Sequence, residues 1–133
     1  MEDYLEQIAA LIAEKGQARV ADIAERLSIS QASVSNMVKR LAQEDLVHYK
    51  RYHGVTLTAR GRGVADFIIR RHEVLTDFLE LFGLDEQTIY NDVEGMEHHI
   101  SSPTIQVFEA LVQELQASPE TVRRISNRLK EAK

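Results

Sequence analysis

The sequence predicts a mainly α-helical protein in two parts, and three observations lead to that expectation. Apolar residues recur at helical spacing along most of the 133 residues. Residues 47–58 depart from that spacing with two short segments of the β type. Charge also divides the chain, because residues 1–71 hold 11 Lys and Arg against 9 Asp and Glu, whereas residues 72–133 hold 5 against 12. We therefore expect a first domain with a hairpin and a second, acidic domain of helices alone.

Three helices are expected in the first 44 residues. The first should cover residues 2–15, where apolar side chains lie at helical spacing and Gly16 follows as a helix end. A short second helix should cover residues 20–27. A polar interruption ending at Ser30 precedes the third helix, residues 31–44, and Ser30 is a good N-cap for it.

A β-hairpin is expected directly after the third helix. Its first segment covers residues 47–52, His53 and Gly54 form the turn, and residues 55–58 return. Helix, helix, turn, helix and hairpin is the order of a winged helix-turn-helix domain, which we place at residues 1–62.

The second domain, residues 63–133, should consist of helices. Gly83, Asp85, Pro103 and Pro119 interrupt its apolar pattern where helices are expected to end or begin. The apolar faces exceed what one small core requires, so we expect a homodimer to cover the surplus. The expected helices run from Ala59 to about Phe82, from Asp85 to about Ile100, from Ser102 to about Gln116, and onward from Ser118.

Composition excludes several classes of protein. The chain has no cysteine, so disulfides and thiolate metal ligands are both ruled out. No apolar run approaches the length of a membrane span, and the N-terminus lacks the basic and then apolar order of a signal peptide. We expect a cytoplasmic protein with no membrane partner, in which any metal site uses oxygen and imidazole nitrogen.

The first domain has the charge and residue types of a DNA-binding module. Between residues 26 and 71, nine basic residues stand against three acidic ones. Small and amide side chains near the start of the third helix can approach base edges in a major groove, while lysine and arginine lie beside phosphates. A small helical domain with an ordinary solvated face, or a winged helix used for protein contacts, is the alternative. The residues expected at double-stranded DNA are Gln31, Ser33, Ser35, Asn36, Lys39, Arg40, Lys50 and Arg51.

Glu94, Glu97 and His98 indicate a metal site in the second domain. Spacings of three and four place them on one face of a helix. Two carboxylates one turn apart repel each other unless a positive charge lies between them, and a divalent cation supplies that charge. The alternative for such a triplet is an ordinary solvated helix face.

Two other kinds of protein fit the sequence less well than a metal-dependent DNA-binding protein. A carboxylate-bridged metalloenzyme would need Glu-x-x-His on two helices, but Glu97 stands where that motif requires histidine. The His-x-x-Glu-His motif would lack its first histidine, and no nucleophile and base are paired elsewhere, so we expect no enzyme. A winged-helix regulator of an organic ligand would leave the converging carboxylates unexplained.

Four segments together resemble the manganese-responsive repressors of the DtxR family over essentially the whole chain. They are residues 3–8, the helix-turn-helix, residues 71–73, and the stretch 89–99 with its sequence IYNDVEGMEHH. In the iron-responsive relatives, the positions of Asp3 and Glu94 carry methionine and cysteine. The resemblance implies a DNA-binding domain followed by a helical metal-binding and dimerisation domain. The ligands it implies are Asp3, Glu6, His72, Glu94, Glu97 and His98.

The resemblance also implies a function, namely Mn²⁺-dependent repression of manganese uptake genes by a homodimer that binds a palindromic operator. Four carboxylates and two imidazoles offer enough donors for two ions per subunit, and hard donors suit Mn²⁺ or Fe²⁺ better than copper(I). A response mainly to Fe²⁺ or Zn²⁺ is the alternative. Metal binding is expected to tie Asp3 and Glu6 to the second domain and to hold two recognition helices roughly 34 Å apart.

The chain departs from the family at one place. Relatives commonly have a proline near the start of the recognition helix, where this chain has Gln31 and Ala32.

Overall fold

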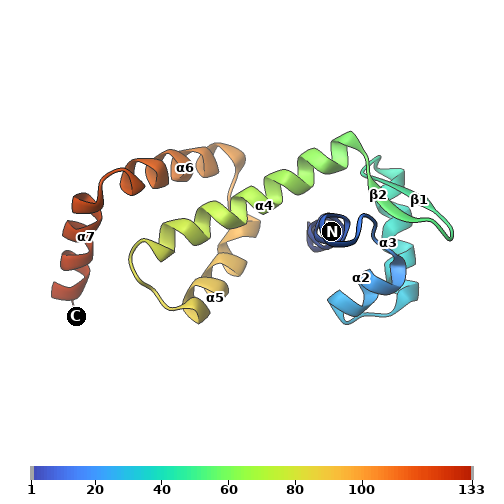
Figure 1. Cartoon of the computed structure of the whole chain (residues 1–133), viewed down its shortest axis with the longest axis horizontal. Helices are drawn as coiled ribbons and strands as arrows, with labels where there is room; N and C mark the ends of the chain where they lie inside the picture. The colour runs from blue at the N-terminus through green and yellow to red at the C-terminus, as the bar shows by residue number, and fades with distance from the viewer. Residues whose placement is uncertain (1, 133) are drawn as a thin grey trace. The chain divides into compact units, whose positions relative to one another are not determined.

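The computed structural model describes residues 2–132 and divides into two compact units, residues 1–69 and 70–133. The fold is mainly helical, with one two-stranded sheet among the described residues (Figure 1). Helix α4 begins in the first unit and ends in the second. The elements are α1 (Glu2–Lys15), α2 (Val20–Leu27), α3 (Gln31–Gln43), β1 (Val47–Lys50), β2 (Gly54–Leu57), α4 (Ala59–Glu80), α5 (Glu86–Met96), the 3₁₀ turn η1 (Glu97–His99), α6 (Ser102–Gln116) and α7 (Pro119–Glu131).

The first unit is a winged helix-turn-helix with one apolar core. Three consecutive helices and the hairpin contribute to this core, and Ile68 of α4 also belongs to it. The two strands pair antiparallel, with Val47 opposite Leu57 and Tyr49 opposite Val55. Burial of these side chains explains why α2 forms at all, since an eight-residue helix is marginal in water.

Local caps define the helix ends that the sequence indicated. The hydroxyl of Ser30 accepts a hydrogen bond from the Ser33 N–H at 3.1 Å, as expected for the N-cap of α3. Gly16 ends α1 with φ +80°, and its N–H donates to the Ile12 carbonyl at 2.8 Å. Asp85 caps α5 by accepting from the Thr88 N–H at 2.9 Å.

The hairpin turn lies two residues earlier than the sequence indicated, and β1 ends at Lys50 instead of continuing to Tyr52. The His53 N–H donates to the Lys50 carbonyl at 3.0 Å, which closes the turn around Arg51 and Tyr52. Gly54 is therefore not a turn residue but the first residue of β2, opposite Lys50. Tyr52 occupies the left-handed region instead, with φ +74°.

The second unit has its own core, in which α4, α5 and α6 meet. Leu75, Ile89, Val93 and Ile105 are buried there. Phe78 packs edge to face against Phe108 of α6, with ring centroids 5.3 Å apart. Arg70 of α4 also pairs with Glu109 of α6. Packing of α4 against α5 is the feature that positions the candidate metal ligands.

Helix α5 ends before the residue that the sequence indicated. We expected this helix to continue to about Ile100, but the regular helix ends at Met96 and the last turn tightens over Glu97–His99. The Glu97 N–H still donates to the Val93 carbonyl. Ile100 is extended, with φ −108° and ψ 128°, because the chain leaves the helix there to join α6.

Large apolar side chains remain exposed on the second unit, as expected for a domain with surplus apolar surface. The exposed apolar residues of this unit are Leu84, Tyr90, Met96, Val107, Leu111 and Leu129.

Within residues 2–132, none of the helices is both long enough and apolar enough to cross a membrane.

Candidate metal centre and DNA-binding surface

The candidate metal centre uses residues from two neighbouring segments of the second unit. His72 lies on α4, Glu94 lies in the last turn of α5, and Glu97 begins the 3₁₀ turn. Leu75 follows His72 by three residues and Val93 directly precedes Glu94, and both are buried in the same core. Apolar packing therefore brings the three polar side chains together.

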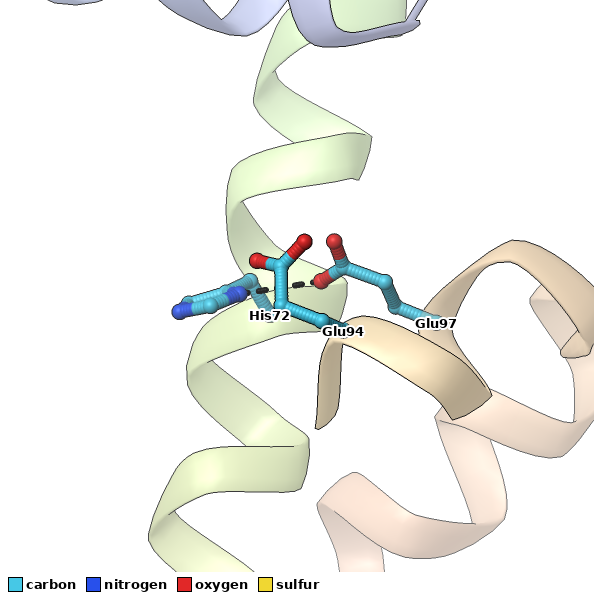
Figure 2. Close-up of side chains that lie close together, drawn as sticks. All are labelled: His72, Glu94 and Glu97. Atoms are coloured by element: carbon cyan, nitrogen blue, oxygen red, sulfur yellow. Dashed lines mark hydrogen bonds and ion pairs between the residues drawn. The ribbon is translucent and has the colours of Figure 1, made fainter. Parts of the chain in front are cut away.

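Two carboxylates and one imidazole converge at this site (Figure 2). His72, Glu94 and Glu97 each offer one ligand atom, and these atoms all lie within 4.8 Å of one another. Ligand atoms that are each about 2.0–2.5 Å from a common cation can be up to about 5 Å apart. The spacing therefore suits a single divalent ion.

Glu97 is the most enclosed of the three candidate ligands. Its side chain is 2% exposed, whereas that of His72 is 34% exposed. His72 Nδ1 lies 2.9 Å from Glu97 Oε2. His98 Nε2 lies 3.7 Å from the other carboxylate oxygen, and the side chain of His98 is 40% exposed. A buried carboxylate thus has a histidine beside each of its oxygens.

The donor set is one of oxygen and imidazole nitrogen, as the absence of cysteine requires. Such donors suit divalent ions of the Mn²⁺, Fe²⁺ and Zn²⁺ type. Two carboxylates this close together are stabilised in their charged form by a cation between them. The residues present therefore fit a metal ion.

The six ligands implied by the sequence are distributed over both units. The structure brings His72 together with Glu94 and Glu97, with His98 next to Glu97. Asp3 is exposed and Glu6 half-buried, and both lie on α1 in the first unit. The sequence pattern paired Glu94 and Glu97 with His98. The group that the structure collects has His72 as its imidazole, because α4 packs beside α5.

The expected DNA-binding residues lie on α3 and the hairpin. Buried Val34, Val38 and Leu41 define the inner face of α3. The opposite face exposes Gln31, Ser33, Asn36, Lys39 and Arg40, with Ser35 half-buried. Lys50 and Arg51 are exposed at the hairpin. All eight residues therefore lie on the first unit, seven of them exposed.

A hollow of about 420 Å³ adjoins this face. Gln31, Ser35 and Arg51, which the sequence indicated as DNA-binding, contribute to its lining. Arg19 and Tyr52 also line it, and sequence reasoning did not single them out. Arg19 lies outside the basic stretch between residues 26 and 71. Its position beside the hairpin is visible only in the structure.

Two family models match this chain, one in each half. Residues 1–55 match the family model described as iron dependent repressor, N-terminal DNA binding domain. Residues 58–126 match the model described as iron dependent repressor, metal binding and dimerisation domain. The two matches together cover nearly the whole chain.

Similar proteins include two described as HTH-type transcriptional regulator MntR. The one from Lysinibacillus sphaericus (strain C3-41) is 46% identical over 125 residues, which are 94% of this chain and 90% of that protein. The one from Bacillus velezensis (strain DSM 23117 / BGSC 10A6 / LMG 26770 / FZB42) is 49% identical over 113 residues, 85% of this chain and 80% of that one. Among solved structures, that of the manganese regulator SloR superposes with a TM-score of 0.71 at 31% identity, over 84% of this chain. This chain covers 53% of that structure.

A DNA-binding module joined to a metal-binding and dimerisation domain defines a metal-dependent transcriptional regulator, not an enzyme. The chain belongs to the iron-dependent repressor family, also called the DtxR family. The resemblance and the fold class inferred from the sequence are thus confirmed. The domain boundary between residues 62 and 63 stays a prediction.

Proposed function

We propose that this regulator responds to Mn²⁺ and represses manganese uptake genes. The observation that supports this proposal most is the convergence of His72, Glu94 and Glu97 within 4.8 Å in the metal-binding domain. Hard carboxylate oxygens and an imidazole suit Mn²⁺. Similar proteins described as MntR or as a manganese regulator support the choice of metal.

The proposed ligand set is larger than this cluster. It adds His98, Asp3 and Glu6 and holds two ions per subunit. For Asp3 and Glu6 the support is residue type and family resemblance, and for His98 it is also the 3.7 Å approach to Glu97. When bound, the ions supply the positive charge that lets neighbouring carboxylates remain ionised together.

The chain's own residues then have separate tasks. Glu97 orients the His72 ring through the 2.9 Å contact with Nδ1, so the ring keeps one position. A homodimer in the cytoplasm presents two copies of α3 to a palindromic operator. Gln31, Ser33, Ser35 and Asn36 are the proposed base-reading residues, and Lys39, Arg40, Lys50 and Arg51 the proposed phosphate contacts.

A regulator that responds mainly to Fe²⁺ or Zn²⁺ is the second candidate. The same oxygen and nitrogen donors bind these ions, and general affinity order places them above Mn²⁺. Selectivity for Mn²⁺ therefore has to come from coordination number and geometry, because affinity order opposes it.

A metal titration tests the proposal. Metal-free protein is incubated with double-stranded DNA from a randomised pool, enriched by the protein itself, while Mn²⁺, Fe²⁺, Zn²⁺ and Co²⁺ are added separately at buffered free concentrations. We expect DNA binding to require metal and to respond to Mn²⁺. Binding that is independent of metal would refute the proposal. A response to Zn²⁺ or Fe²⁺ without one to Mn²⁺ would establish the second candidate.

A further inference from the structure

The hollow beside the recognition helix forms where α2 begins, α3 begins and the hairpin turns. Its volume is about 420 Å³. Among the described residues that line it there are two arginines, Arg19 and Arg51, and no carboxylate. Two cations without an opposing anion make the hollow attractive to a negatively charged group.

Arg19 is held in place from both its backbone and its side chain. The preceding residue, Ala18, pairs with Val55 of β2, and the Val55 N–H donates to the Ala18 carbonyl at 2.6 Å. The Gln17 amide satisfies its hydrogen bonds when its oxygen faces Arg19. That oxygen accepts from Nε and Nη2 of Arg19 at 3.2 Å each, and the Gln17 NH₂ donates to the His53 carbonyl at 3.2 Å. The guanidinium is thus anchored to the hairpin turn.

Arg51 is oriented by a different contact. Its guanidinium carbon lies 5.3 Å from the centre of the Tyr52 ring, which is a cation–π arrangement. Tyr52 is 87% exposed and has φ +74°, a conformation that tyrosine rarely adopts. Strained conformations of this kind persist at functional sites.

We propose that the hollow binds one phosphodiester group of the DNA backbone, with Arg19 as the main contact and Arg51 as the second. The chemistry favours this because a planar guanidinium bonds phosphate oxygens through two parallel N–H groups. Val20 and Ala21 at the start of α2 also line the hollow, and helix N-termini favour anions. Since Gln31 and Ser35 share the lining, a phosphate held here sets the register of α3 on the bases. This inference rests on the proposed DNA-binding function.

The test combines a protein variant with a modified DNA. A duplex enriched from a random pool with Mn²⁺ present is prepared with neutral methylphosphonate at each backbone position in turn. We expect methylphosphonate at one backbone position to weaken DNA binding by the parent protein. The same modification should not weaken DNA binding by Arg19→Gln. The variant should bind unmodified DNA about tenfold more weakly, and the slope of log K against log salt should fall by about 0.9.

Three comparisons exclude simpler explanations. Arg62→Gln removes the same charge from an exposed residue of this unit outside the hollow. Its DNA binding should still be weakened by methylphosphonate at the backbone position assigned to Arg19. Gln17→Ala keeps every charge, so it should lower affinity about threefold with an unchanged salt slope. Inorganic phosphate, compared with chloride at equal ionic strength, should cause no extra inhibition.

Three outcomes overturn the inference. If Arg19→Gln keeps the parent's sensitivity at every modified phosphate, Arg19 contacts none of them. If inorganic phosphate inhibits the parent more than Arg19→Gln and no modified backbone position weakens binding by the parent, the hollow binds a free anion and no DNA phosphate. In both cases the proposed role of the hollow fails, but the proposed function stands as long as the parent binds DNA with Mn²⁺ present. Failure of the parent itself to bind DNA with Mn²⁺ would remove both proposals.

Discussion

Glu97 illustrates how one residue links burial to chemistry. A carboxylate with a 2% exposed side chain has lost almost all contact with water, and such a group is costly to bury without partners. His72 and His98 lie beside its two oxygens, at 2.9 Å and 3.7 Å. Glu94 adds a second carboxylate nearby. A cation stabilises a site of this kind more than it stabilises an exposed acidic cluster. The reason is that solvent screens the attraction between a cation and a buried carboxylate less.

The first prediction concerns Glu94. Glu94→Gln keeps the size of the side chain but removes one charged ligand, so it should abolish the stimulation of DNA binding by Mn²⁺. Helical content should be almost unchanged, because Glu94 lies outside the apolar core. Circular dichroism and a DNA-binding titration measure the two effects. Glu114→Gln, an exposed position on α6, is the matched control, and a normal Mn²⁺ response in Glu94→Gln would remove Glu94 from the site.

The second prediction concerns metal preference. Changing Asp3 to methionine and Glu94 to cysteine replaces two hard donors with soft ones and removes two negative charges at neutral pH. The Mn²⁺ response should weaken relative to those to Fe²⁺ and Co²⁺. The order of metals is measured in the DNA-binding assay under anaerobic conditions. An unchanged order would show that selectivity depends on other residues.

At the scale of elements, Thr58 connects two parts of the first unit. It is 7% exposed, its hydroxyl donates to the Asp45 carbonyl at 2.7 Å, and it accepts from the Gly61 N–H at 2.9 Å. The same side chain therefore caps the start of α4 and holds the turn between α3 and β1. Gly61 allows this approach, since a Cβ there would overlap the Leu46 carbonyl.

The third prediction tests that connection. Thr58→Ala leaves two backbone groups without their partner and should destabilise the protein by about 1–3 kcal/mol. Thr58→Ser keeps the hydroxyl and should cost less than about 1 kcal/mol. Urea unfolding measures both, with Thr56→Ala on the exposed side of β2 as the control. Equal losses in Thr58→Ala and Thr58→Ser would show that the methyl group matters and the hydroxyl does not.

The fourth prediction concerns the acid sensitivity of α5. Hydrogen bonds from the Thr88 N–H and hydroxyl lower the pKa of Asp85 below its usual value. Because the folded-state pKa is the lower one, the contribution is present above about pH 4 and is lost as pH falls through the folded pKa. Asp85→Asn should therefore flatten the acid limb of the stability curve. Unfolding measured across pH tests this, with Asp92→Asn as the control, and an acid limb as steep as the parent's would refute it.

For the whole molecule, the second unit carries apolar surface that its own core leaves exposed. Tyr90 is 60% exposed and Leu84 is 44% exposed, and both line a hollow of about 420 Å³ between α4 and α5. Val107 of α6 is 68% exposed. A dimerisation domain requires such a surface, because contact between two copies buries apolar area that would otherwise face water.

The fifth prediction tests whether the Tyr90 side of this unit forms the dimer contact. Tyr90→Glu places a charge on that surface and should shift the metal-free protein toward monomer. With Mn²⁺ present, its binding to DNA should be weaker by about tenfold or more. Val107→Glu is the matched control on α6. Sedimentation equilibrium measures the association constant. A larger effect of Val107→Glu than of Tyr90→Glu would move the contact to α6.

The sequence by itself determined the features that depend on neighbours in the chain. Helical spacing predicted the helices, and Ser30 and Asp85 were identifiable as caps because a cap bonds an N–H only three residues away. The family could also be recognised from the sequence without coordinates. These features share one physical cause, namely that hydrogen bonding and amphipathic pattern within a helix are local.

Only the tertiary structure decided which distant residues meet. His72 and Glu97 lie 25 residues apart and come within 2.9 Å because apolar packing sets α4 against α5. Arg19 lies in the same hollow as Gln31 and Ser35 of α3 because Ala18 pairs with Val55, 37 positions along the chain. The tightening of α5 after Met96 likewise follows from where α6 has to begin. Such contacts depend on core packing and chain connection, which no spacing within one helix encodes.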